Sequence, residues 1–138
     1  MSFFRLRKKK SIHKKISAIL SDACKMLGEG SLIILSSVDG FLIGVGSNRV
    51  PKEFNDELLA GLFTLVWKTG KKVSTNLNIG RLDYVQFMTR EKNIFIYKNP
   101  NKQSLLITAV TDLDVASLVI REVCERILRK IEKTFNHM

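Results

Sequence analysis

Residues 58–67 form the densest apolar run in the chain, and this run limits the possible folds more than any other feature. On a helical wheel its apolar residues cover an arc of roughly 220°, whereas a helix lying on one surface needs roughly 100° or slightly more. One sheet covers only part of such an arc. An isolated chain of 138 residues would leave apolar surface on the order of several hundred square ångströms in water, which soluble proteins seldom tolerate.

Hydrophobic periodicity and turn signals divide the chain into three helices and five strands in the order αββαβββα. Helical spacing predicts a first helix from Ser11 and a second over residues 53–74. A third is predicted to open at Thr111, Asp112 and Asp114. Asp39-Gly40 is expected to supply the positive φ angles of a tight turn in the first hairpin. Polar turns separate the later strands, predicted at 82–89, 93–98 and 104–110, and indicate an antiparallel sheet. We therefore expect one α/β (α+β) domain over residues 12–138, preceded by a basic tail, residues 1–11.

The third predicted strand is apolar on both faces. Leu82, Tyr84 and Met88 point one way, and Val85 and Phe87 point the other. At a sheet edge such a strand would be prone to aggregate unless another strand docked beside it. Pairing of two copies about a two-fold axis would cover both the strand and the apolar helix.

The residues predicted to form this dimer interface are Leu59, Phe63, Val66, Trp67, Leu82, Tyr84, Val85, Gln86, Phe87 and Met88. The alternative is a core that encloses the second helix within one subunit.

The net charge of +10 lies mostly at the start of the chain. Residues 1–15 hold seven basic residues and no acidic one, so residues 16–138 carry only +3. Large apolar residues mixed with a basic run are typical of peripheral membrane segments. The candidate contacts with an anionic membrane are Phe3, Phe4, Arg5, Leu6, Arg7, Lys8, Lys9 and Lys10. A solvated tail without a target and a nucleic-acid contact remain alternatives, the latter disfavoured because the strands lack interleaved exposed aromatic and basic residues.

The sequence contains no catalytic or metal-binding constellation. His13 lies in the basic segment and His137 is the penultimate residue, so we expect neither to be oriented in a site. Cys24 and Cys124 fall on apolar helix faces without a CxxC motif, and we expect reduced core thiols. Gly44-Val45-Gly46 lacks the third glycine of a dinucleotide fingerprint. We therefore expect a non-enzymatic protein without cofactor or metal. The absence of a secretory signal predicts a cytoplasmic location, peripheral at the inner membrane surface if the tail meets lipid.

Basic residues near the end of the second predicted helix could surround a partner-binding surface. They are Lys68, Lys71 and Lys72, with Arg81 just before the third strand. Charges at the rim of an interface steer encounter with an acidic partner more than they add affinity. An ordinary solvated helix end, favoured by the helix dipole, is the alternative.

Four stretches of the chain resemble the roadblock (dynein light chain type) family. They are ILSSVDGFLIGVGS, ELLAGLFTLVWKTGKKV, GRLDYVQFM and IFIYKNPNKQSLLITAVTD, within a similarity that covers residues 12 to about 133. The resemblance implies a five-stranded antiparallel sheet in the order 2-1-5-4-3. The first and third helices would lie on one face of it and the second on the other.

The resemblance also implies how the chain works. It implies a homodimer, or a heterodimer with a paralogous roadblock protein, whose third strands abut in a ten-stranded sheet. Members of the family bind or regulate small Ras-like GTPases, or serve as scaffolds in motor and membrane-signalling complexes. The leading expectation is therefore a dimeric adaptor that binds a small Ras-like GTPase. The alternative is a longin-like or profilin-like trafficking or cytoskeletal module.

Overall fold

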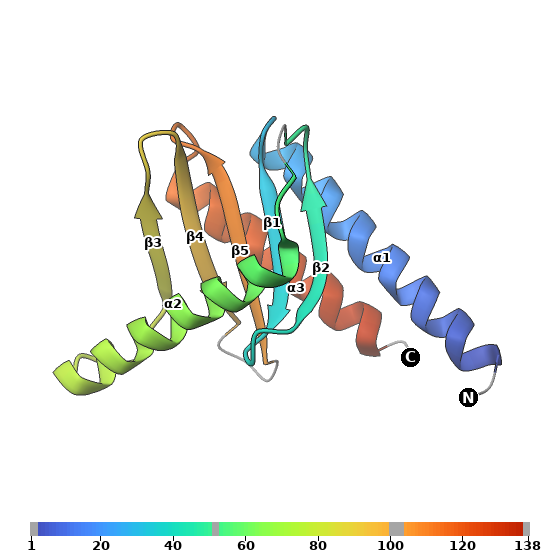
Figure 1. The fold of residues 1–138 in the computed structure, drawn as a ribbon, viewed down its shortest axis with the longest axis horizontal. Helices are drawn as coiled ribbons and strands as arrows, with labels where there is room; N and C mark the ends of the chain where they lie inside the picture. Colours follow the sequence, from blue (N-terminus) through green and yellow to red (C-terminus); the bar gives the residue numbers. More distant parts are fainter. Residues whose placement is uncertain (1–2, 51–52, 100–103, 137–138) are drawn as a thin grey trace.

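The computed structural model describes residues 3–50, 53–99 and 104–136. Figure 1 shows these residues in the predicted order αββαβββα. The elements are α1 (Phe3–Leu27), β1 (Leu32–Ser37), β2 (Leu42–Ser47), α2 (Asp56–Leu77), β3 (Tyr84–Met88), β4 (Lys92–Lys98), β5 (Leu105–Asp112) and α3 (Ser117–Asn136).

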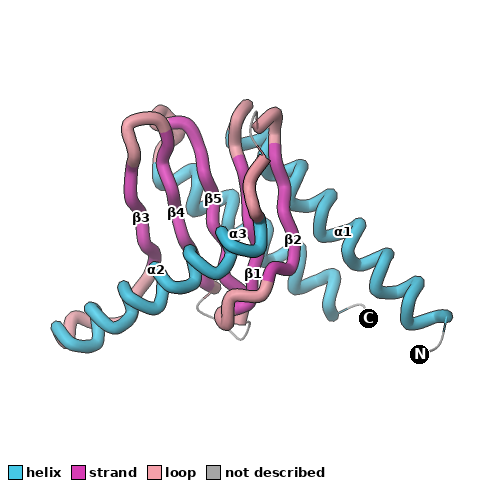
Figure 2. The backbone as a smooth tube through the Cα atoms, in the orientation of Figure 1, coloured by secondary structure: helices cyan, strands magenta, loops and turns pink. Residues whose placement is uncertain are grey.

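The strands form one sheet in the order β2-β1-β5-β4-β3, and every neighbouring pair is antiparallel. In Figure 2 the strands lie side by side, with α2 crossing in front of them and α1 and α3 behind. The sheet order and the placing of the helices agree with what the resemblance implied.

Alternating side chains of the strands build a core on each face of the sheet, because successive residues point to opposite sides. On β1, Ile33 and Leu35 pack against α1 and α3, whereas Leu32 and Ile34 pack against α2. The two-helix side holds the larger core, which includes Leu20 of α1 and both cysteines. Cys24 and Cys124 are buried and free, as predicted.

Several boundaries differ from the sequence expectations for identifiable reasons. α1 begins at Phe3 rather than at Ser11. α2 begins and ends three residues later than predicted, because the Asn55 side chain accepts a hydrogen bond from the Leu58 amide and Asn78 ends the helix in the left-handed conformation. In the first hairpin, Gly40 has a positive φ of 95° and Asp39 does not.

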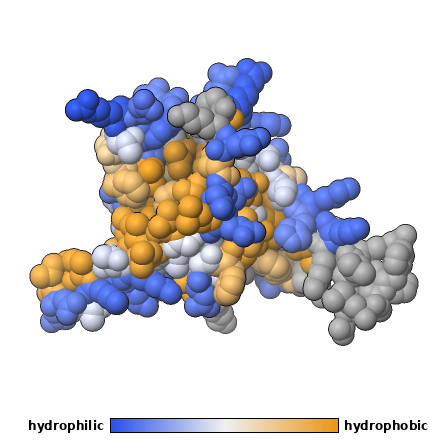
Figure 3. All heavy atoms as spheres, in the orientation of Figure 1, coloured by the Kyte–Doolittle hydropathy of each residue, from blue (hydrophilic) through white to orange (hydrophobic). Residues whose placement is uncertain are grey.

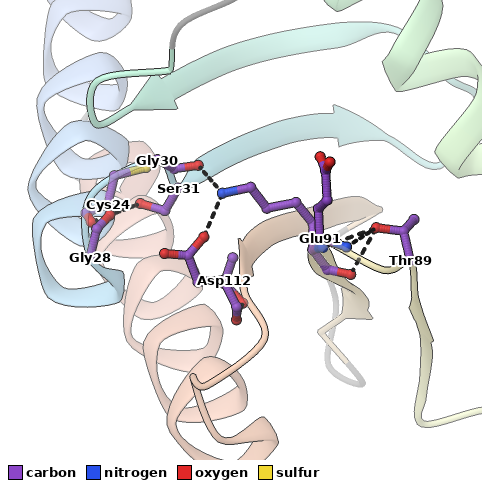
Figure 4. A network of polar contacts seen from close by, with 9 residues as sticks. Cys24, Gly28, Gly30, Ser31, Thr89, Glu91 and Asp112 are labelled. Carbon is purple, nitrogen blue, oxygen red and sulfur yellow. Dashed lines mark hydrogen bonds and ion pairs between the residues drawn. The ribbon is translucent and has the colours of Figure 1, made fainter.

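The prediction that Thr111 and Asp112 open the third helix was wrong. Both residues belong to β5, where they pair with Asn93 and Lys92 of β4, and α3 begins at Ser117. Figure 4 shows how this end of the sheet is joined to the turn after α1. Lys92 Nζ donates to Asp112 Oδ1 at 2.6 Å and to the carbonyl of Gly30 at 3.4 Å.

Candidate interaction surface

The apolar arc of α2 is divided between the core and the surface. Its inner side carries Ala60, Phe63, Thr64 and Trp67, which are buried against the sheet. Its other side carries exposed apolar residues that we call the outer stripe, namely Leu58, Leu62, Leu65, Val73 and Leu77. Leu58 and Leu65 keep 58% and 61% of their surface exposed. A single subunit therefore covers only part of the arc, as the sequence indicated.

The C-terminal end of the outer stripe, Val73 and Leu77, lies near a free edge of the sheet, because the preceding Gly70 packs against Val85 of β3. Among the described residues, β3 pairs with β4 alone, so its other side offers unpaired backbone groups. Tyr84, Phe87 and Met88 of this strand are exposed. Figure 1 shows the C-terminal half of α2 extending past β3, where this subunit places no further strand among the described residues. In Figure 3 apolar surface gathers over α2 and the neighbouring strands, with hydrophilic residues along the opposite side of the helix.

The structure separates the predicted interface residues into two groups. Leu59, Val66, Leu82 and the five β3 residues are exposed or half-buried and thus accessible to a partner. Phe63 and Trp67 are only 8% and 6% exposed and pack on this subunit's own sheet, so they offer little surface.

The amide of Gln86 already has partners within the subunit. It donates to Asn93 Oδ1 at 3.0 Å and to Ser117 Oγ at 2.7 Å, and its oxygen accepts from the Ser117 hydroxyl. These bonds connect the edge strand β3 to the first turn of α3 and fix the Gln86 side chain.

Sequence reasoning did not include Leu58, Leu62 and Leu65 among the interface residues, although they lie on the same apolar arc. Helical periodicity defines the width of the arc but not which side meets the sheet. The small residue Ala60 and the short Thr64 mark the inner side, because small side chains let a helix approach a sheet closely. The Thr64 hydroxyl also donates to the Ala60 carbonyl at 2.7 Å, which satisfies it within the helix.

The predicted rim residues Lys68, Lys71, Lys72 and Arg81 are all exposed. Lys71 and Arg81 lie together on an open cavity of about 480 Å³ between α2 and the ends of β3 and β4. Lys68 and Lys72 do not line it. The full set of lining residues is Trp67, Lys71, Arg81, Leu82, Asp83, Lys98, Asn99 and Arg121.

Among the charged side chains that line the cavity, Arg121 of α3 is held by several hydrogen bonds and ring contacts. Its guanidinium donates to both oxygens of Asp83, at 2.7 and 3.1 Å, and to Glu125 at 3.3 Å. Its central carbon lies 5.8 Å from the ring centroids of Tyr84 and Tyr97, within cation–π range. The hydrogen bond to Asp83, followed by that to Glu125, raises the pKa of Arg121, while burial and then Glu125 raise the pKa of Tyr97.

The predicted membrane contacts fall on the first turns of α1. Of the eight candidate contacts, Lys10 is exposed. The structure does not describe the side chains of the other seven, which are Phe3, Phe4, Arg5, Leu6, Arg7, Lys8 and Lys9. In the described part of the chain, no helix has the length and apolar character to cross a membrane. The described His, Cys, Asp and Glu side chains form no group of three or more that could hold a metal ion.

Comparison with known proteins places this arrangement among known folds. No protein-family model matches the sequence, and no curated protein matches it significantly. Several solved structures match in fold. The gliding protein MglB from Thermus thermophilus is 12% identical with a TM-score of 0.75, over 93% of this chain and 93% of that chain.

Two further structures extend this likeness. A Roadblock/LC7 domain from Streptomyces avermitilis is 11% identical with a TM-score of 0.72, over 86% of this chain and 96% of that chain. An MglB structure with a tetrameric arrangement is 15% identical with a TM-score of 0.73, over 90% of this chain and 93% of that chain. The chain therefore has the roadblock fold, and the resemblance seen in its sequence is confirmed at the level of the fold.

Proposed function

We propose that this chain is a non-catalytic, roadblock-type regulator that pairs with a second copy of itself, or with a paralogue, and binds a small Ras-like GTPase. The observation that carries the proposal is that the C-terminal end of the outer stripe, Val73 and Leu77, lies next to the free edge of β3. Both are surfaces that a soluble protein usually covers.

One two-fold arrangement covers the free edge and the C-terminal end of the outer stripe at once. If the β3 strands of two copies pair antiparallel, their unpaired backbone groups satisfy each other. The C-terminal half of each α2, which extends past β3 in Figure 1, then lies over the partner's sheet. On that sheet, Val85 and Phe87 point to the face that α2 covers. Val73 and Leu77 of the outer stripe, 51% and 61% exposed, are placed to contact that surface. The tetrameric arrangement of an MglB structure supports self-association in this fold.

The mass of the particle in solution tests the pairing. Light scattering should give twice the subunit mass of 15.7 kDa, and Leu77→Lys should give the subunit mass, because a lysine in a paired apolar surface loses its hydration. Met26→Lys is the matched control, since Met26 is 46% exposed on α1, which packs on β2 at the sheet edge opposite β3. A wild-type particle of 15.7 kDa at micromolar concentration would remove the basis of the proposal.

The GTPase part of the proposal rests on the roadblock resemblance and on the exposed cations of α2. Lys68 and Lys72 lie outside the cavity and are accessible to an acidic surface. A pull-down from the source cells, probed for small GTPases, identifies the partner. Reversing both charges with Lys68→Glu and Lys72→Glu should slow association with that GTPase and leave dissociation nearly unchanged. The control is Lys130→Glu on the exposed side of α3. Equal association rates for the wild type, the double variant and the control would contradict a role for these lysines.

We also propose that the basic start of α1 contacts an anionic membrane. α1 is already helical at Phe3, so residues 3–11 extend the helix by about 13 Å before Ile12, the first of the described side chains that packs on the core. Each basic residue near an anionic surface contributes roughly 1 kcal/mol, an attraction that salt weakens. The full chain should therefore sediment with phosphatidylserine vesicles at low salt, and a chain lacking residues 1–10 should not. Equal sedimentation of the two would eliminate the contact.

A further inference from the structure

The cavity between α2 and the ends of β3 and β4 brings together four cations from four separate segments. Lys71 comes from α2, Arg81 from the loop before β3, Lys98 from the end of β4 and Arg121 from α3. A solvated charged face usually belongs to one element, whose residues repeat at its own period. Here strand pairing and helix packing bring together residues as far apart as 71 and 121.

Three of the four cations are not neutralised within the described part of the subunit. Asp83 is the one acidic side chain among the lining residues, and it is engaged with Arg121 at 2.7 Å. Lys71, Arg81 and Lys98 make no ion pair with any described residue. With four cations and one carboxylate, the lining carries a net charge of +3, which Glu125 beside Arg121 reduces to +2. In a concave site, charges of one sign focus the potential and raise the local concentration of anions.

Part of this lining is held in place before any ligand arrives. Arg121 is fixed by the two oxygens of Asp83 and by the rings of Tyr84 and Tyr97. Lys98 is half-buried at the end of a paired strand, opposite Leu106 of β5. A ligand that meets fixed cations loses less free energy to the ordering of side chains.

The shape and the other walls define the class of ligand. A volume of about 480 Å³ lies within the range of about 300–1,000 Å³ that is usual for small-molecule sites. Trp67 and Leu82 supply apolar wall beside the cations. Guanidinium groups bind phosphate through paired hydrogen bonds, and lysines add point charges.

We propose that this cavity binds the phosphate group of a phosphorylated ligand, with Arg81, Lys98 and Lys71 as the contacting cations and Arg121 as a fixed wall. The proposal depends neither on the pairing of subunits nor on a GTPase. An acidic protein segment is the competing occupant, and the test separates it.

Titration calorimetry with inorganic pyrophosphate at low salt tests the site directly. The full chain should bind pyrophosphate, and Arg81→Gln and Lys98→Gln should each weaken binding at least about tenfold, the loss of one charge-assisted contact. Neither side chain has an ion-pair partner among the described residues, so the variants should keep the wild-type melting temperature. Lys68→Gln and Lys72→Gln are the matched controls, because both are exposed cations of α2 outside the cavity.

Two results would overturn the proposal. The first is no pyrophosphate binding at millimolar concentration, which would leave an acidic protein segment as the occupant. The second is equal weakening by the cavity variants and the controls, which would show a general attraction to the basic surface.

A vesicle experiment identifies the source of the phosphate once binding is found. Wild type and Lys98→Gln share the same N-terminal helix, so a difference between them in sedimentation with phosphatidic acid vesicles comes from the cavity. Weaker sedimentation of Lys98→Gln assigns a lipid headgroup, and equal sedimentation assigns a soluble ligand.

Discussion

At the scale of single residues, two glycines let α1 lie directly on β2. A Cβ at Gly46 would overlap the backbone carbonyl of Leu20, and one at Gly44 would come within 2.9 Å of Ile16 Cγ2. Backbone atoms cannot rotate away as a side chain can, so at Gly46 the whole helix would have to move. The glycines that the sequence shows as Gly44-Val45-Gly46 therefore serve helix packing rather than a nucleotide loop.

Gly46→Ala should lower the free energy of unfolding by roughly 3 kcal/mol, at the upper end of the cost of overpacking. Gly61→Ala is the matched control, since a Cβ there meets nothing within 4 Å. Because Gly61 lies inside α2, the control should gain about 0.5–1 kcal/mol in unfolding free energy from its higher helix propensity. Urea denaturation measures both values. A Gly46→Ala protein as stable as wild type would show that α1 does not pack this closely.

At the scale of elements, α2 and β3 carry more apolar surface than one subunit buries. α2 has a complete set of local signals, with Asn55 at its N-cap, Asp56 and Glu57 in its first turn and Asn78 at its C-cap. Its outer stripe therefore belongs to a well-formed helix and not to a frayed end. β3 is held to the subunit by β4 on one side, by Arg121 of α3 over the ring of Tyr84, and by the Ser117 hydroxyl of α3.

Hydrogen exchange should distinguish the free edge from a paired one. In a dilute, unpaired subunit, the β3 amides that do not bond to β4 exchange quickly. On pairing, these amides should become protected as protein concentration rises, because the second β3 accepts their hydrogen bonds. The amides of β1, which lies between β2 and β5, provide the control and should be protected at every concentration. Protection of β3 that is independent of concentration would argue against pairing through this strand.

At the scale of the whole molecule, two buried thiols in the larger core make the free energy of unfolding depend on pH in the alkaline range. Burial raises the pKa of the Cys24 thiol from 9.0 to about 11, and it raises the pKa of Cys124 further. In the unfolded chain both thiols lose their protons at their ordinary values. The folded state then binds more protons than the unfolded state, so the free energy of unfolding falls as the pH rises.

The stability that the protonated thiols supply should be fully present below pH 9 and should be lost as the pH rises toward 11. For Cys24 the loss amounts to roughly 3 kcal/mol, at about 1.4 kcal/mol per pH unit. Urea denaturation in reductant at a series of pH values measures this slope. Cys24→Ala should be less stable at neutral pH because of its cavity, yet its stability should fall less steeply above pH 9. Parallel slopes for the two proteins would rule out Cys24 as the titrating group.

The sequence by itself determined the element order, the two faces of each strand and the surplus of apolar surface on residues 58–67. These properties follow from the periods of 3.6 and 2 residues, which are local. It could not determine which side of α2 meets the sheet, so Phe63 and Trp67 were expected at an interface while Leu58 and Leu65 were not. That choice depends on the shape of the sheet beneath the helix.

Only the tertiary structure decided that Lys71, Arg81, Lys98 and Arg121 surround one cavity. Each of them is an ordinary charged residue in its own segment. They meet because β3 pairs with β4 and because α3 packs behind the strands that α2 covers from the front. Contacts between residues distant along the chain have no local period, and for that reason the sequence pattern did not contain this site.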